Sequence, residues 1–481
     1  LNQARLNTYV LFVETATRIN NTKGRIGIIV PSGIATDDIC KKLFSFLVRE
    51  SRIVSLFDFE NRERLFPEVD SRYKFSLLTL RGSGSGNPAS FAFFLQDAND
   101  LRLADRFYKL TSNDFQLLSP ISGLCPTFRS SRDREIVLRI YERMRPLILQ
   151  QESNFDWSKS DFLIMFRSDD SSHLYKSVDE IGARQPPPSS LPQMVINDST
   201  YLPVWESKLF HQFDHRFASF ANTTKKEKKK GNAIELRHHE KNDAWIAIPR
   251  YWTVAEAVQR SLKTRNWTRL WVAGYRDITN ATNERTAIAT ILPLGGAAQP
   301  LNLFLPESSV HACLWLGAMN SFALDYVARQ RIGGVHLNIT TCRQLPIVGP
   351  KSISDDQRRF IINRVLELIY TSPALEPFAK DCGCFGPPFR WNEERRFLLR
   401  CELDGVYFHL YDINQDDADY IMETFPIVRR KDEQKYGEYR TKRVILECYD
   451  AMAEAMKTGR PYQTILDPPP ADPRVAHKLT E

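Results

Sequence analysis

An aromatic residue in a long polar turn, Phe66, is the first residue whose position suggests chemistry. It stands in the triplet Leu65-Phe66-Pro67, between two apolar runs at 53–59 and 75–80. A ring on a loop could offer a flat contact surface to a ligand. The alternative is that Phe66 and Pro67 only fill the underside of the loop. Spacing alone favours this alternative, because aromatic side chains are usually buried.

Two other sets of residues have the types that hydrolytic or metal chemistry uses. Asp58, Glu60 and Lys74 combine two carboxylates with a lysine, as nuclease sites do. His211 and His215 would share one face of a helix. No glutamate stands beside the first histidine, however, so the zinc-protease pattern is not met.

The eight cysteines are scattered over 481 residues and do not form a disulfide framework. A reducing cytoplasm is the expected compartment. Cys382, Cys384, Cys401 and Cys448 are enough thiols for one zinc ion, but their spacing is not that of a zinc knuckle. We therefore expect reduced thiols and no metal.

The elements expected around Phe66 form an α/β unit. Arg25–Val30 is a short apolar run closed by Pro31 and Gly33, as in a buried strand. A helix should follow, with Asp37 and Asp38 at its positive end. Its expected apolar face consists of Ile39, Leu43, Leu47 and Val48.

Two more strands, Ile53–Phe59 and Phe75–Leu80, complete a β-α-β unit followed by another strand. This order suits the far edge of a doubly wound sheet, and a helix at Leu6–Ile19 should lead into it. The GSGSG segment, Gly82–Gly86, joins the strand at 75–80 to a strand-like run at Ser90–Leu95. We expect a hairpin loop there rather than a phosphate cradle, because no helix N-terminus follows it.

Later segments carry further local signals. Ser130 and Ser131 should lead into a helix at 132–149. The pairs Thr253/Glu256 and Ser354/Gln357 form capping-box patterns before two more helices, the first of them at 254–263. Strands are expected at 162–166, 270–272 and 287–292, and loops at Gln185–Pro188 and at the basic run 225–230.

The segments GRIGIIVPSGIATDD (24–38) and FDFENRERLFPEVDSRYKFSLLTL (57–80) resemble adenine-N6 DNA methylases, in the second half of their methyltransferase domain. The most similar families are the type IIG restriction–modification enzymes and the methylase of BREX-type phage defence. In these families an aromatic of the Leu-Phe-Pro turn stacks on the flipped target base, and by that match the residue here is Phe66. Asp58, Glu60 and Lys74 then lie inside methylase-like strands, and the family keeps its nuclease elsewhere. We therefore reject the nuclease interpretation.

The resemblance implies S-adenosylmethionine as cofactor and direct attack of the adenine N6 on its methyl group. An Asn-Pro-Pro-aromatic motif polarises the amine in that family. The chain contains neither this motif nor a glycine-rich strand-to-helix turn for the cofactor. We expect no catalytic residue in this chain, a cofactor bound mainly by an upstream half, and no activity from the fragment alone.

Three stretches, 202–217, 276–293 and 320–347, resemble the target-recognition region of type IIG enzymes. The last is the most specific, with a helix, a basic turn, a double glycine and a Leu-Pro end. In such regions arginine reads guanine, asparagine reads adenine, and lysine holds phosphates. The expected DNA contacts are Arg276, Asn283, Arg285, Arg329, Arg331 and His336, with Lys225, Lys226, Lys228, Lys229 and Lys230 on the backbone. The alternative for each is an ordinary surface charge, and the lysine run could give only non-specific attraction.

Trp391–Met452 resembles the C-terminal helical part of the same enzymes. It is expected to brace the recognition domain. Its expected DNA clamp consists of Arg429, Arg430, Lys431, Arg440 and Lys442. The alternative is the charged surface of a helical bundle. The tail after Pro461 should be extended and poorly ordered.

The expected fold is therefore α/β, a partial methyltransferase sheet, followed by an α+β recognition domain and a mostly helical domain. The boundaries are 1–115 for the methyltransferase half, 116–153 for a helical connector, 154–350 for target recognition and 351–481 for the helical domain. The expected function is site-specific binding of double-stranded DNA and adenine-N6 methylation, within a larger restriction–modification or phage-defence enzyme. The fragment would supply target recognition and base-flip stacking.

Two alternatives remain from other functional classes. One is a non-catalytic DNA-specificity module that acts with a separate catalytic subunit. The other is a degenerate methylase fold used as a protein scaffold, which predicts no salt-dependent binding to duplex DNA. The expected protein partner is an upstream methylase or nuclease region, or a separate subunit.

Composition agrees with a DNA-binding protein without requiring one. The net charge of +7 gives a mild bias toward polyanions. The chain has no apolar run long enough to span a membrane and no secretory signal pattern. We expect a bacterial or archaeal cytoplasmic protein. Because the first residue is Leu1 rather than Met, we also expect a fragment of a longer protein.

Overall fold

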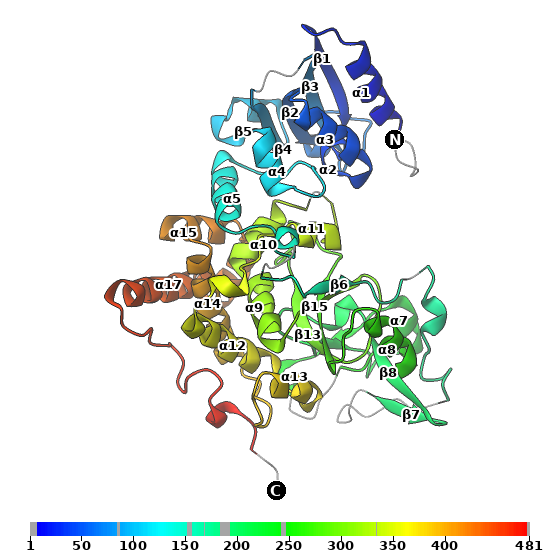
Figure 1. Cartoon of the computed structure of the whole chain (residues 1–481), viewed down its shortest axis with the longest axis vertical. Coiled ribbons are helices and arrows are strands. Elements are labelled where there is room, and N and C mark those ends of the chain that lie inside the picture. The colour runs from blue at the N-terminus through cyan, green and yellow to red at the C-terminus, as the bar shows by residue number, and fades with distance from the viewer. Residues whose placement is uncertain are drawn as a thin grey trace. The chain divides into compact units, whose positions relative to one another are not determined.

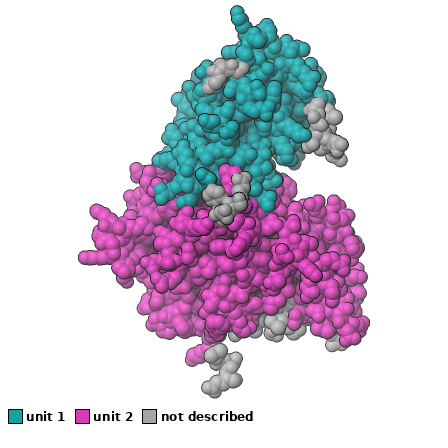
Figure 2. All heavy atoms as spheres, in the orientation of Figure 1, with its two compact units in different colours: residues 1–148, 327–335, 340–346 teal, residues 149–326, 336–339, 347–481 magenta. Residues whose placement is uncertain are grey.

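The computed structural model describes residues 7–83, 87–151, 156–167, 169–182, 193–241, 247–332 and 334–478. Over these residues the protein is a mixed α/β structure with separate sheets and a helical C-terminal region, as expected in outline (Figure 1). Two compact units are distinguished by colour in Figure 2. Unit 1 comprises residues 1–148, 327–335 and 340–346, and unit 2 comprises residues 149–326, 336–339 and 347–481. Most of the predicted recognition region and all of the predicted helical region fall in unit 2.

The centre of unit 1 is a five-stranded sheet in the order β1-β3-β2-β4-β5. β3 pairs antiparallel with β1 and β2, β2 pairs parallel with β4, and β5 pairs antiparallel with β4. The strands are β1 Arg25–Pro31, β2 Ile53–Glu60, β3 Lys74–Arg81, β4 Ala89–Leu95 and β5 Tyr108–Leu110. The three strands predicted around Phe66 are therefore present.

β1 was predicted to be buried, but it is an edge strand of the described sheet. Its exposure alternates along the strand, and Ile29 is 57% exposed. Helix α1 (Thr8–Ile19) lies against β1 and buries Val10 and Val13, whereas Phe12 is exposed. The apolar sequence was misleading because an apolar run does not distinguish a strand covered on both faces from an edge strand.

The helix predicted after β1 is present, but its buried face differs. Gly33–Thr36 forms the short α2, a 3-10 turn follows at Asp38–Cys40, and α3 is Lys41–Arg49. Ile39 is exposed because it lies in the 3-10 turn, where side chains repeat every three residues instead of every 3.6. Phe44, which the predicted face omitted, is fully buried.

The loop after β3 is not a hairpin. β3 and β4 do not pair, because β2 lies between them in the sheet. Part of the GSGSG segment, residues 84–86, lies outside the described residues, as do Leu6, Asn154, Gly333 and the predicted loop Gln185–Pro188.

Unit 1 also contains α4 (Ser112–Leu118) and α5 (Ser131–Arg143). The helix predicted at 132–149 stops at Arg143, since a proline at 146 disfavours helical backbone at the residue before it. Two later segments, residues 327–335 and 340–346, also belong to unit 1. There, Gln344 Oε1 accepts hydrogen bonds from the backbone N–H of Ile121 and from Ser122.

The main sheet of unit 2 has the order β13-β12-β15-β6, with antiparallel pairing throughout. Its strands are β6 Asp161–Leu163, β12 Trp271–Arg276, β13 Ala289–Pro293 and β15 Leu301–Leu305. Almost every residue of helix α9 (Ser309–Asn320) is buried. Trp315 of α9 stacks on Phe304 of β15, with 4.6 Å between ring centroids, so this helix and sheet form one core.

Smaller strands extend unit 2. β8 pairs with β7, β11 and β14, and β9 pairs with β10. Their bounds are β7 Met194–Ile196, β8 Ser199–Trp205, β9 Ala218–Ser219, β10 Ile234–Glu235, β11 Trp252–Val254 and β14 Gly296–Ala297.

Two local predictions in unit 2 were wrong in detail. Helix α8 (Ala255–Lys263) forms, but Val254 stands at its N-cap, and the Thr253 hydroxyl is buried in β11 without a described hydrogen-bond partner. Lys225–Lys230 is helix α7 rather than a loop. Its start is fixed by a capping box in which Thr224 and Glu227 bond to each other's backbone N–H.

The region beyond residue 350 is helical, as predicted, and the Ser354/Gln357 capping box opens α12. Its helices are α12 Asp355–Ile369, α13 Glu376–Asp381, α14 Glu393–Leu410, α15 Gln415–Glu423, α16 Pro426–Tyr436 and α17 Arg440–Thr458.

Three further helices lie before residue 350. They are α6 Leu147–Gln150, α10 Phe322–Arg329 and α11 Ile339–Arg343.

The tail after residue 461 was predicted to be poorly ordered, but its described part is held by buried polar groups. Glu402 of α14 is fully buried and pairs with Arg364 at 2.7 Å. The same carboxylate accepts hydrogen bonds from the hydroxyls of Tyr462 at 2.8 Å and Thr464 at 2.7 Å. A buried carboxylate needs such partners, so the tail completes its hydrogen bonding.

Cys401 and Cys448 are buried, while Cys382 and Cys384 are partly exposed. In the part of the chain that is described, no three His, Cys, Asp or Glu side chains are grouped as metal ligands would be. Among those same residues, no helix combines the length and the apolar character that a membrane crossing needs.

Candidate functional site

The loop that carries Phe66 connects β2 to β3 and is fixed by one buried side chain, Asn61. The Asn61 amide accepts a hydrogen bond from the Phe66 backbone N–H at 2.9 Å. Its NH2 group donates to the carbonyl oxygens of Phe66 at 2.9 Å and Val69 at 2.8 Å. Arg64, in the left-handed region at φ +52°, turns the chain between them. The loop thus has a defined shape without being part of the sheet.

The Phe66 ring is only partly packed. It meets Phe75 of β3 edge to face, with 4.8 Å between ring centroids, and the residue remains 39% exposed. Leu65, Val69 and Tyr73 of the same loop are exposed as well. The loop therefore presents several apolar side chains to solvent around one supported ring. Whether that ring stacks on a base stays a prediction.

Polar groups lie where β1, β2 and β3 approach this loop. Asp58 of β2 is buried and accepts hydrogen bonds from the hydroxyls of Ser32 and Ser76. Burial raises the pKa of Asp58 to about 6, although the two hydroxyls lower it in part. Glu60 is paired with Lys74 at 2.9 Å and with Arg62 at 2.8 Å. The carboxylates considered above for a nuclease are thus engaged in bonds within the sheet.

The structure brings together the three stretches of unit 2 that were singled out in the sequence. Gln212, from 202–217, donates to the Ala287 carbonyl at 2.8 Å. The Leu337 N–H donates to the Asp277 backbone carbonyl at 2.7 Å. Asn320 exchanges hydrogen bonds with the Ala289 backbone at 3.0 Å in both directions. These hydrogen bonds join the three stretches in the interior of unit 2, because the bonded residues are buried.

Two arginines predicted to read bases form contacts within unit 2. Arg276 donates to the Phe210 carbonyl and lies over the ring of Phe217, and burial lowers its pKa to about 10. Arg285 pairs with Asp325 at 2.6 Å, with its side chain 10% exposed and that of Asp325 fully buried. Both guanidinium groups support the fold as they stand.

Asn283 and His336 are more accessible. Asn283 is exposed at a turn, which is closed by a hydrogen bond from the Asn283 N–H to the Asn280 carbonyl. The His336 side chain is 53% exposed, with Nδ1 at 3.3 Å from Asp277. These two side chains are placed where a ligand could reach them.

Arg329 and Arg331 belong to the part of the chain that joins unit 1. Arg329, at the end of α10, is 9% exposed. The Arg331 guanidinium is enclosed near Tyr141 and Cys125, and its burial lowers the arginine pKa. Neither group is on an open surface within its unit.

The lysines of α7 are mostly on the surface, and the Lys225 side chain is 94% exposed beside Asp179. Four of the five residues in the predicted C-terminal clamp form ion pairs. These are Arg429 with Glu423 and Glu433, Lys431 with Glu284, Arg440 with Glu394, and Lys442 with Asp419 and Glu423. Arg430 is exposed and forms no ion pair with a described residue. Such pairing is typical of a charged bundle surface, and DNA contact by these residues stays a prediction.

Sequence reasoning missed Asn61 and Asp325. Asn61 is one polar residue in a polar turn, and no spacing rule separates it from Asn or Asp residues that merely face solvent. Asp325 stands within the largely apolar sequence of α10, FALDYVAR, and its carboxylate is fully buried. Only the fold reveals that each organises a candidate segment.

Comparison with known proteins connects unit 1 to a family. Residues 2–66 match the model described as Eco57I restriction-modification methylase, and the match ends at Phe66. No curated protein matches the chain. A solved structure described as the type IIG restriction endonuclease BpuSI is similar at 15% identity, covering 85% of this chain and 49% of that chain. The TM-score is 0.26, and this chain spans about half the length of that protein.

Proposed function

We propose that this chain, which is related to restriction–modification methylases through residues 2–66, recognises a specific site in double-stranded DNA for adenine-N6 methylation. It would act within a larger restriction–modification or phage-defence enzyme of the bacterial or archaeal cytoplasm. The observation that carries the proposal is a partly exposed Phe66 ring, on a loop fixed by Asn61, inside the segment that matches the methylase family.

In this proposal Phe66 replaces the stacking that the target adenine loses when it leaves the duplex. Base extrusion costs a few kcal/mol, and an aromatic ring returns part of it. The edge-to-face contact with Phe75 orients the ring, and the three hydrogen bonds of Asn61 prevent the loop from collapsing onto the sheet. Unit 2 would supply sequence readout through the region that contains Asn283 and His336, and phosphate contacts through α7.

S-adenosylmethionine would supply the methyl group, but the residues of this chain do not fit it. The sequence has no Asn-Pro-Pro-aromatic segment. No helix begins directly after the glycine segment that follows β3, since the chain continues there into β4. We therefore propose that the cofactor pocket lies outside this chain.

The exposed edge of the unit 1 sheet supports the proposal that another protein region packs against this chain. β1 has its described neighbour, β3, on one side only, and it exposes Ile29 together with Phe12 and Ile19 of α1. An exposed, apolar edge strand is a surface that proteins normally cover. An upstream methylase region would cover it, and so would a separate catalytic subunit acting with this chain as a specificity module. These two are distinguished by whether the cofactor-binding methylase sequence is joined to this chain or belongs to a separate subunit.

A selection experiment tests the proposal. The chain is incubated with randomised DNA duplexes at two salt concentrations, and the retained sequences are determined. We expect one short adenine-containing motif to be enriched, with retention that falls as salt rises because phosphate contacts release counterions. Retention without sequence preference, or no retention at either salt, would overturn the proposal. The latter result would favour a scaffold.

A further inference from the structure

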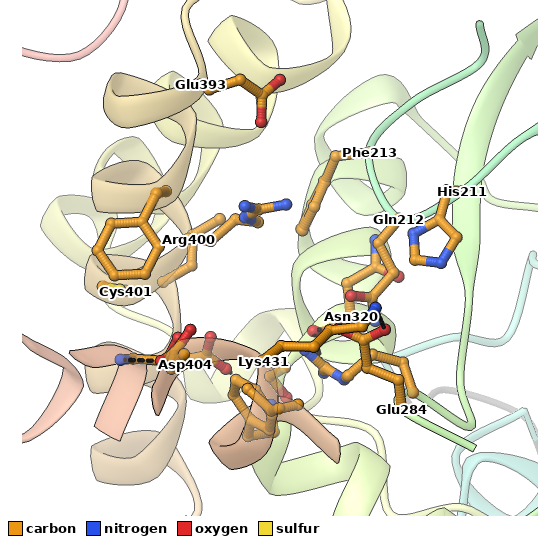
Figure 3. Close-up of a pocket in the computed structure, with 18 of the residues that line it drawn as sticks. His211, Gln212, Phe213, Glu284, Asn320, Glu393, Arg400, Cys401, Asp404 and Lys431 are labelled. Atoms are coloured by element: carbon orange, nitrogen blue, oxygen red, sulfur yellow. Dashed lines mark hydrogen bonds and ion pairs between the residues drawn. The ribbon is translucent and has the colours of Figure 1, made fainter. Parts of the chain in front are cut away.

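A cavity of about 420 Å³ lies in unit 2 beside helix α14, within the size range of small-ligand pockets. We call it the α14 cavity. Its border includes Phe213, Asn320, Phe397, Arg400, Asp404 and Lys431 (Figure 3). The residues come from the turn at 211–214, the α9–α10 junction, α14 and α16, all of which belong to unit 2.

Several charged side chains at the border are already neutralised. Glu284 pairs with Lys431, Glu394 pairs with Arg440, and Arg285 pairs with Asp325. Arg400 differs from them, because it makes no hydrogen bond or ion pair with any residue that the structure describes. Its guanidinium extends from α14 into the cavity (Figure 3). The cavity therefore contains a fork of hydrogen-bond donors without an acceptor.

An acceptor stands one helical turn further along α14. Asp404 and Arg400 are four residues apart, which places their Cβ atoms about 5–6 Å from each other on one helix face. They do not form the ion pair that this spacing allows. Asp404 uses Oδ1 to accept the Phe322 backbone N–H at 2.7 Å, and its other oxygen has no described partner. Donor and acceptor thus stand side by side at the cavity border, each with unused capacity.

The opposite border carries a strained aromatic residue. Phe213 has φ +57°, a conformation that bulky residues rarely adopt. The Phe213 N–H donates to the Ala289 carbonyl at 3.2 Å, and the Arg396 guanidinium donates to the Phe213 carbonyl at 3.0 Å. The ring projects toward the Arg400 guanidinium (Figure 3). Strain of this kind is typical of ligand sites. Phe213 is 3% exposed, so most of its side chain is packed and only a small part borders the cavity.

A planar ligand with acceptors on one edge and donors on the next would satisfy these groups. Guanine has this pattern: its O6 and N7 accept from arginine, and its N1–H and amino group donate to a carboxylate. The part of the Phe213 ring that borders the cavity offers an aromatic contact for the base. We propose that the α14 cavity binds a guanine base through Arg400, Asp404 and Phe213.

The base has two sources with the same chemistry, a free guanine nucleotide or nucleoside and a guanine displaced from DNA. The second source rests on the proposed function, whereas the first does not. Binding of the chain to duplex DNA without a bulge tests the proposed function separately. Failure of the guanine-binding proposal can therefore be distinguished from failure of the proposed function.

Two probes distinguish the sources in the whole chain. Guanosine binding is measured by equilibrium dialysis, with adenosine as the comparison. Binding to a duplex with one bulged guanine is compared with a bulged adenine in the same context. The variants are Arg400→Gln and Asp404→Asn, the latter keeping an acceptor for the Phe322 N–H. The control is Arg359→Gln, which removes an exposed arginine of α12.

We expect at least one guanine probe to bind at least tenfold more tightly than its adenine counterpart. Each cavity variant should weaken that binding at least tenfold while remaining folded at the assay pH, and Arg359→Gln should not weaken it. Binding of guanosine identifies the free form as a ligand, and binding of the bulged guanine alone identifies the DNA base. The proposal is overturned if neither guanine probe is preferred over adenine, or if folded Arg400→Gln and Asp404→Asn proteins bind as the unaltered chain does.

Discussion

The side chain of Asn61 holds the peptide units on both sides of Phe66. Its oxygen accepts the Phe66 N–H and its NH2 group donates to the Phe66 carbonyl, each at 2.9 Å. A third hydrogen bond, to the Val69 carbonyl at 2.8 Å, closes the loop. The exposed ring is therefore carried by a loop whose shape depends on one amide.

Replacing Asn61 with Asp should loosen this loop, because a carboxylate keeps the size but loses both donors. We expect the free energy of unfolding to fall by about 1–3 kcal/mol, as for other buried groups left unpaired. Trypsin should also cut faster after Arg62, Arg64 and Arg72. Limited proteolysis and denaturant titration measure both effects. Asn266→Asp, at an exposed position of unit 2, is the matched control, and equal proteolysis of the two variants would contradict the role of Asn61.

Asp325 should matter for stability rather than for base reading. The Asp325→Asn variant leaves the Arg285 guanidinium buried without its ion pair and weakens the bonds from the Thr286 N–H. Loss of one partner of a buried pair costs about 3–5 kcal/mol. We expect a clear drop in melting temperature by calorimetry. An unchanged melting temperature together with altered sequence preference would instead favour DNA readout by Arg285.

The lysines of α7 should affect how much DNA is bound rather than which sequence is bound. Replacing all five with Gln should reduce the slope of log affinity against log salt by about 0.9 for each phosphate that is no longer neutralised. The enriched sequence should stay the same. Binding titrations at several salt concentrations measure the slope, with Lys109→Gln and Lys457→Gln as controls on other exposed surfaces. A change in the selected motif would show that α7 reads bases.

Asp404 should make stability depend on pH. Burial raises its pKa to about 7, although Arg285 and the Phe322 N–H lower it in part. The folded state then holds this proton more tightly than the unfolded state does. The resulting stabilisation is complete below about pH 4, near the ordinary pKa, and is lost as pH rises through about 7.

The Asp404→Asn variant has no titrating proton at this position, so its stability should lack the pH dependence that Asp404 causes. Its melting temperature relative to the unaltered chain should therefore rise between pH 5 and pH 8. Calorimetry at both pH values measures the difference. A constant difference across this range would show that Asp404 has an ordinary pKa.

The sequence predicted the strands of unit 1 and the capping box of α12 because these depend on neighbouring residues. It could not show that β1 is an edge strand, since an apolar run reads the same in both environments. Nor could it show that Arg285 meets Asp325, because that pair depends on how α10 lies against the segment before β13. Lys225–Lys230 is a different case, because the capping pair Thr224 and Glu227 is visible in the sequence and indicates a helix despite the basic run.

The central claim is that Phe66 lies against the target base, and a photocrosslink tests it directly. A duplex carrying the selected motif is prepared with 5-iodouracil in place of the target adenine, which leaves a mispair that is easier to extrude. After irradiation in complex with the chain, the crosslinked peptide is identified by mass spectrometry. The account predicts an adduct at Phe66 that is lost in Phe66→Ala and kept in Tyr73→Ala. Efficient crosslinking at other residues, with none in the loop at 61–73, would contradict it.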